Sequence, residues 1–220
     1  MNSARAGLVK LFGTAQSLKP GKSPVSGAPC VFWKVIGWYF FEGSMTERGG
    51  PRWQMIYFSQ QQDAFYIADE TGRMLVMPGA ADTRIPSHSS YKGYISPEKA
   101  GETPIDGRAL KFIESLDEGS RARFLKHEGK KICVTEYVIR ETDPLFVFGT
   151  ATPVDTGSVN ESHPTLVVRK DLIDKTMFIA GAGEGFRPLE QYSLATVLAI
   201  ISGVGVLAIT IYIIFMQLVL

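Results

Sequence analysis

The residues best suited to metal chemistry in this chain are three histidines and two cysteines. The histidines are His88, His127 and His163, and no two of them have the spacing of metal ligands. The cysteines, Cys30 and Cys133, lie far apart and form no Cys-x-x-Cys pair. The sequence therefore predicts no metal site.

Residues suited to nucleophilic or phosphate chemistry lack the neighbours that such chemistry needs. The segment SPVSG at 23–27 differs from the Gly-x-Ser-x-Gly pattern of a nucleophile elbow. The glycines of GAGEG at 181–185 are better explained by a linker than by a phosphate-binding loop. Asp69 and Glu70 are adjacent carboxylates, which a turn explains. We predict no catalytic residue and no cofactor, and whether the protein is an enzyme stays open.

Glu136 is an acidic residue within an otherwise apolar run, ICVTEYVI, which is typical of a buried strand. A buried carboxylate can serve as a general base or can form a structural ion pair. We favour the ion pair, with Arg140 or Lys34 as the partner.

The two cysteines each lie in an apolar, strand-like run, and two interpretations stay open. Buried free thiols are the usual state of cysteine in a reducing compartment. In an oxidising space, a disulfide between Cys30 and Cys133 would close a loop of about 100 residues and add about 4 kcal/mol of stability.

The elements that must position these residues are mainly β-strands, because β-branched and aromatic residues are concentrated in short runs. The clearest local signal is a β-hairpin, since two such runs flank the turn residues Asp69-Glu70-Thr71-Gly72. The other predicted strands are Cys30 to Phe41, Arg52 to Ser59, Ile132 to Arg140, Leu145 to Thr150, Thr165 to Arg169 and Thr176 to Ala180.

The middle of the chain has two different patterns. Residues 80–106 mix Ser, Gly, Pro and charged residues, which predicts a long loop. Residues 107–127 carry apolar side chains at helical spacing, with Asp106 as the N-cap and Gly119 as a break. We therefore predict a mainly β fold, a small antiparallel barrel or sandwich with an inserted helical segment. A barrel of the oligonucleotide-binding type is one candidate shape.

The chain ends in 27 residues, 194–220, that carry no charge. A helix of this length extends about 40 Å, whereas the apolar core of a bilayer is about 30 Å thick. We predict a C-terminal transmembrane helix at 191–220 and a folded domain at 1–190. Lys175 and Arg187 precede the span, which favours a cytoplasmic domain in a single-pass cell-membrane protein. The net charge of +1 gives no indication of nucleic-acid binding.

Four segments, taken in order, resemble the GIDE domain, also called the beside-a-membrane (BAM) domain. The first joins Gly13 and Ala15 to a Ser-Pro-x-Ser-Gly-x-Pro-Cys run, and the second is the Asp-x-x-Gly hairpin followed by Pro-x-Ala. The third and fourth are VTEYVIRETDPLFVFGTA and LVVRKDLIDKTMFIA, so the resemblance covers about residues 7–190. The family-motif positions are Ser23, Pro24, Ser26, Gly27, Pro29, Cys30, Asp69, Gly72, Glu136 and Gly149.

The resemblance implies a domain that lies beside a membrane. In mitochondrial-type membrane ubiquitin ligases this domain lies between two spans, and a C-terminal RING finger carries out the transfer of ubiquitin. A two-zinc RING needs eight Cys or His ligands, whereas this sequence contains two cysteines and three histidines. The chain is therefore similar to the prokaryotic forms without a RING, and the family offers no catalytic residue for this domain.

Three functions follow as hypotheses. The first is a membrane-anchored interaction or scaffold module that binds a protein partner. The second is a ubiquitin-ligase-related component that recruits substrate for a separate RING protein. The third is a small-ligand or lipid-sensing barrel with the 80–106 loop as its lid.

Overall fold

The computed structural model describes residues 6–43, 50–79, 81–97, 100–154, 165–170 and 177–181, and these are mainly β as predicted. The chain divides into the units Met1–Gly183 and Glu184–Leu220, and every described residue belongs to the first. Within the described ranges no helix is long and apolar enough to cross a bilayer. The predicted span at 191–220 lies outside those ranges.

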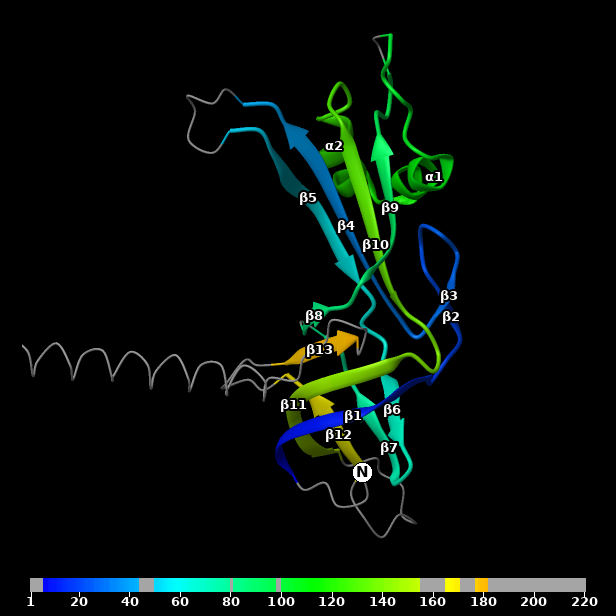
Figure 1. Cartoon of the computed structure of the whole chain (residues 1–220), viewed down its shortest axis with the longest axis vertical. Coiled ribbons are helices and arrows are strands. Elements are labelled where there is room, and N and C mark those ends of the chain that lie inside the picture. The colour runs from blue at the N-terminus through cyan, green and yellow to red at the C-terminus, as the bar shows by residue number, and fades with distance from the viewer. Residues whose placement is uncertain are drawn as a thin grey trace, which may run out of the picture. The chain divides into compact units, whose positions relative to one another are not determined.

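Five strands close into a barrel, in the order β1, β6, β7, β12 and β11, with β11 pairing back to β1 (Figure 1). The pair β7–β12 is parallel and the other four pairs are antiparallel, which corrects the predicted all-antiparallel barrel at one pair. The five strands agree in number with the oligonucleotide-binding type of barrel, a likeness that concerns shape only. The strands are β1 (Gly7–Ser17), β6 (Phe65–Asp69), β7 (Gly72–Val76), β11 (Pro144–Val154) and β12 (Thr165–Arg169).

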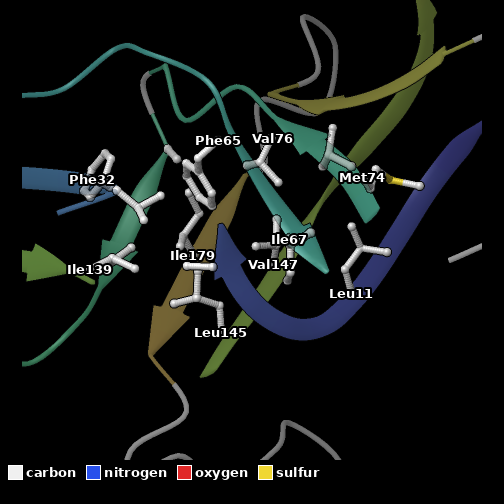
Figure 2. Packing of buried hydrophobic residues seen from close by; sticks show 14 of the residues in the cluster. Leu11, Phe32, Phe65, Ile67, Met74, Val76, Ile139, Leu145, Val147 and Ile179 are labelled. Carbon is white, nitrogen blue, oxygen red and sulfur yellow. The ribbon is translucent and has the colours of Figure 1, made fainter. Parts of the chain in front are cut away.

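Side chains at alternate strand positions fill the interior of the barrel, as the period of a β-strand requires. Leu11 of β1, Ile67 of β6 and Val147 of β11 point toward one another in Figure 2. Ile67 and Val147 are fully buried. Two further short strands extend the sheet beyond β11, namely β13 (Phe178–Gly181) and β8 (Asp82–Arg84).

A second sheet of four antiparallel strands has the order β5, β4, β10, β9 (Figure 1). Helices cover one of its faces, where a Cβ on Gly37 would lie only 2.4 Å from Cζ of Phe124. Glycine at position 37 therefore lets the second helix approach the sheet. The strands are β4 (Phe32–Phe41), β5 (Arg52–Gln60), β9 (Ser87–Gly93) and β10 (Ile132–Ile139).

The inserted helical segment consists of two helices, α1 (Gly107–Ser115) and α2 (Glu118–Leu125). The predicted N-cap is confirmed, because the Asp106 carboxylate accepts a hydrogen bond from the backbone N–H of Arg108 at 2.8 Å. The predicted break at Gly119 is wrong by two to three residues. The first helix ends before Asp117, which caps α2 by accepting from the N–H of Ser120 at 3.0 Å.

The β-hairpin is confirmed as β6 and β7, with Asp69 opposite Gly72. One carboxylate oxygen of Asp69 accepts from the backbone N–H of Thr71 at 2.8 Å and of Gly72 at 3.0 Å. It also accepts from the Thr71 hydroxyl at 2.7 Å, and this bond lowers the pKa of Asp69.

The predicted loop at 80–106 is wrong over much of its length, because β8 and β9 lie within it and Tyr94 bridges to Pro104. Strand β9, with the sequence SHSSYKG, lies at the edge of its sheet. It contains few apolar side chains, and therefore its sequence does not have the pattern of a buried strand. Two strands at the N-terminal end were not predicted, which are β1 and the short β2 (Gly21–Lys22). The strand predicted from Cys30 to Phe41 is divided at Val31, so that Cys30 belongs to the short β3 (Pro29–Cys30), which pairs with β2.

Candidate functional site

The most distinctive polar site of the described residues is built around Glu136, whose side chain is fully buried in β10. Its Oε1 accepts a hydrogen bond from the backbone N–H of Val25 at 3.0 Å. Both of its carboxylate oxygens accept from the backbone N–H of Ser26, with the nitrogen 3.3 Å from each oxygen. Consecutive backbone N–H groups that converge in this way form a small concave anion site. Glu136 therefore fixes the segment before β3 against the middle of β10.

The segment that Glu136 holds is itself a closed turn. The backbone N–H of Ser23 donates to the carbonyl of Ala28 at 2.9 Å, and that of Gly27 donates to the carbonyl of Ser23 at 3.1 Å. The hydroxyls of Ser23 and Ser26 lie 2.7 Å apart. We call residues 23–28 together with Glu136 the Glu136 clip. It brings together family-motif positions more than 100 residues apart in the sequence.

The ion pair predicted for Glu136 is not formed in this arrangement, since backbone N–H groups are its hydrogen-bond donors. Lys34 instead donates to the carbonyl of Thr83 at 2.8 Å, and Arg140 lies 3.2 Å from Nδ1 of His88. Backbone donors are available because the turn at Val25 leaves its N–H groups outside any strand ladder. The Glu136 clip is thus an architectural site, in which the described donors to the carboxylate are the backbone N–H groups of Val25 and Ser26.

The remaining family-motif positions lie in other parts of the fold. Pro29 and Cys30 form β3 directly after the clip. Asp69 and Gly72 close the β6–β7 hairpin. Gly149 lies in the barrel, where a Cβ would come within 2.9 Å of a methyl group of Val168. These positions support turns and close packing, and they do not converge with the clip on one pocket.

The two cysteines are free and buried. The N–H of Val31 bonds the carbonyl of Ile139, so Cys30 lies near the end of β10 that is opposite to Cys133. Six residues of extended strand span about 20 Å, far beyond disulfide reach. The predicted alternative of a Cys30–Cys133 disulfide is therefore incompatible with this fold. Burial, with the negative charge of Glu136 in second place, raises the pKa of Cys30 to about 11, so its thiol stays protonated at neutral pH.

Lys34, which the sequence predicts only as a possible partner of Glu136, is a buried amine. Its side chain is 8% exposed, and its Nζ lies 4.5 Å from the centre of the Tyr137 ring. Burial lowers the pKa of Lys34, and the charge of Asp82 partly offsets this effect. Its bond to Thr83 connects the four-stranded sheet to β8. Lys34 therefore joins the two sheets.

In the part of the chain that the structure describes, both helices pack on the same face of the four-stranded sheet. Gly37 faces α2, so the residues on the opposite face of β4, Ile36, Trp38 and Phe40, point away from this helix. The residues of β5 that pair with these three point away from it as well. Phe40 lies opposite Trp53 with ring centres 5.3 Å apart. We call this apolar surface the sheet face, and its side chains are Ile36, Trp38, Phe40, Trp53, Met55 and Phe58.

A second exposed apolar surface lies on the outside of the barrel. Leu8 and Phe12 of β1 are 61% and 53% exposed. Lys10 lies between them and pairs with Phe148, and Phe148 pairs with Phe178. We call this surface the barrel patch, and its apolar side chains are Leu8, Phe12, Phe148 and Phe178.

Sequence reasoning missed both apolar surfaces, although each has a signal in the sequence. The run RWQMIYFSQ of β5 alternates large apolar residues with others, and the run GLVKLFG of β1 is apolar on both faces. Such patterns predict strands, but they do not tell which face is covered.

Over the described ranges, no three or more His, Cys, Asp or Glu side chains come together as a group that could hold a metal ion. Comparison of the chain with protein-family models, with curated proteins and with solved structures gives no match.

Proposed function

We propose that this protein is a membrane-anchored, GIDE-like interaction module, in which residues 191–220 form the anchor and the β-rich domain binds a protein partner. The observation that carries the proposal is the barrel patch, where Leu8 and Phe12 are more than half exposed. Exposed apolar side chains that are grouped on one surface are typical of sites for protein partners.

The composition of the barrel patch supports a protein-binding role. Phe12 packs on Phe146 with ring centres 4.7 Å apart, and the guanidinium of Arg84 lies 5.1 Å from the centre of the Phe178 ring. Aromatic and arginine side chains dominate the binding energy of many protein interfaces. A rigid aromatic side chain also loses little entropy when a partner covers it.

The Glu136 clip also supports the proposed interaction module, through the structural role of its hydrogen bonds. Five of the motif positions that resemble the GIDE domain lie in it, and the hydrogen bonds of the clip hold a turn in place. The buried polar group of this motif, the Glu136 carboxylate, binds backbone N–H groups and so stabilises the fold that presents the surface. This arrangement favours an interaction module over an enzyme.

The ligand-sensing alternative is less favoured, because packed apolar side chains fill the interior of the barrel (Figure 2). The predicted lid is also partly a strand, β9, that pairs along β10. A ligase-related role would act through a partner that carries a RING finger. Identification of the partner therefore decides between a general scaffold and a ligase component.

The test is photo-crosslinking of the full chain in its native membrane, with a photoreactive phenylalanine analogue at position 12. The matched control carries the same analogue at Lys111, which is exposed on α1. We expect a discrete protein adduct from position 12 that is at least about tenfold stronger than from position 111, and that Leu8→Asp weakens. Equal, diffuse labelling from both positions would refute a partner site at the barrel patch.

A further inference from the structure

The sheet face has an apolar half, on β4 and β5, and a polar and basic half, on β10 and β9. The two strands at one side supply only apolar side chains over three successive cross-strand pairs, which are Ile36 with Phe58, Trp38 with Met55, and Phe40 with Trp53. Three of these side chains are strongly exposed, Trp53 at 36%, Met55 at 57% and Phe58 at 52%. One half of the face is therefore a strip of aromatic and aliphatic groups in contact with solvent.

The other half of the sheet face is polar and basic. Lys92 of β9 lies opposite Cys133, which in turn lies opposite Trp38, so Lys92 points to the same side as the apolar strip. Lys131 lies next to Phe40, whose backbone N–H donates to the Lys131 carbonyl at 2.8 Å. Both lysines are exposed. Along β4, β5, β9 and β10, no strand residue that points to this face is acidic.

The charge pattern of the sheet face helps to identify what covers it. Lys92 and Lys131 lie beside the apolar strip, and no strand residue that points to this face is acidic. The same face of a second copy would therefore offer these lysines no acidic strand residue, whereas an anionic bilayer can receive a few inserted apolar side chains and binds lysines through its phosphates.

We propose that the sheet face docks on the surface of an anionic phospholipid bilayer. Trp53, Met55 and Phe58 enter the boundary between headgroups and acyl chains, where tryptophan is favoured. Lys92 and Lys131 extend along the same surface and bind the lipid phosphates. This inference rests on the proposed function for its membrane anchor, and it uses a surface separate from the barrel patch.

The three tryptophans of the chain allow a direct test with an internal control. Trp38 and Trp53 belong to the sheet face, whereas Trp33 packs against the core on the helix-covered side. The double variant Trp33→Phe/Trp38→Phe leaves Trp53 as the only tryptophan, and Trp38→Phe/Trp53→Phe leaves Trp33. Each full chain is reconstituted into vesicles of phosphatidylcholine and phosphatidylserine whose acyl chains carry bromine near the headgroup.

We expect the bromine to quench Trp53 at least about threefold more than Trp33, because only Trp53 enters the lipid. Lys92→Glu/Lys131→Glu, or vesicles of phosphatidylcholine alone, should bring the quenching of Trp53 close to that of Trp33. Equal quenching of the two tryptophans in chains that float with the vesicles would overturn the docking and leave the anchor intact. Failure of the chains to float with the vesicles would overturn the anchor and the docking together.

Discussion

Replacement of Glu136 by alanine is expected to lower the free energy of unfolding by about 3–5 kcal/mol. The carboxyl group is fully buried and accepts from the backbone N–H groups of Val25 and Ser26. Its removal leaves these donors without an acceptor and leaves a cavity in the sheet. A loss of this size is a large share of the stability of an ordinary domain. Urea unfolding of the full chain in detergent, followed by tryptophan fluorescence, measures it.

Two variants control for this prediction. Glu136→Gln keeps the shape and one acceptor oxygen, so we expect about half of the loss. Glu141→Ala removes an exposed carboxylate five residues further along, whose only described bond comes from the Ser17 hydroxyl at 3.4 Å, and should change stability by at most about 0.5 kcal/mol. Similar small effects at positions 136 and 141 would contradict the role of the Glu136 clip.

Replacement of Phe124 by alanine is expected to cost about 3–5 kcal/mol in the free energy of unfolding. The ring is fully buried and fills the space above Gly37, with its centre 5.7 Å from that of Tyr57. It is the buried residue of α2, so its loss removes the main contact of that helix with the sheet. The same urea measurement detects the change.

The neighbouring residue supplies a matched control for the helix contact. Leu125 has a side chain of similar apolar character but is 45% exposed, so Leu125→Ala should cost at most about 0.5 kcal/mol. Equal losses at positions 124 and 125 would contradict the packing of Phe124 on the sheet as the source of the loss, since alanine is the stronger helix former in both variants.

Local signals could be predicted well from the sequence. The hairpin at Asp69 and the N-cap at Asp106 both depend on side chains that bond their own neighbours in the chain, which sequence reports directly. The sequence predicts the helix break at Gly119 because glycine is a poor helix former. Asp117 in fact ends the first helix and caps the second, and a glycine is tolerated in the first turn.

Features that depend on distant parts of the chain could not be predicted. Glu136 binds backbone N–H groups about 110 residues away. Every residue except proline has a backbone N–H, so the sequence does not indicate which of these groups will bind the carboxylate. Edge strand β9 could not be predicted, because most of its residues are exposed or half-buried and it therefore contains few apolar residues. The sheet face and the helix-covered face of β4 are both apolar, and only the fold shows that helices cover one of them.

Extraction of the full chain from native membranes at alkaline pH tests the anchor at 191–220, on which the proposed function and the lipid docking both depend. The control is Leu207→Arg, which places a charge near the middle of the uncharged segment and disfavours insertion by about 3 kcal/mol. We predict that the unaltered chain stays with the membrane pellet and that a large part of the variant is released. Release of the unaltered chain into the supernatant would show that residues 191–220 are not a membrane anchor and would overturn both proposals.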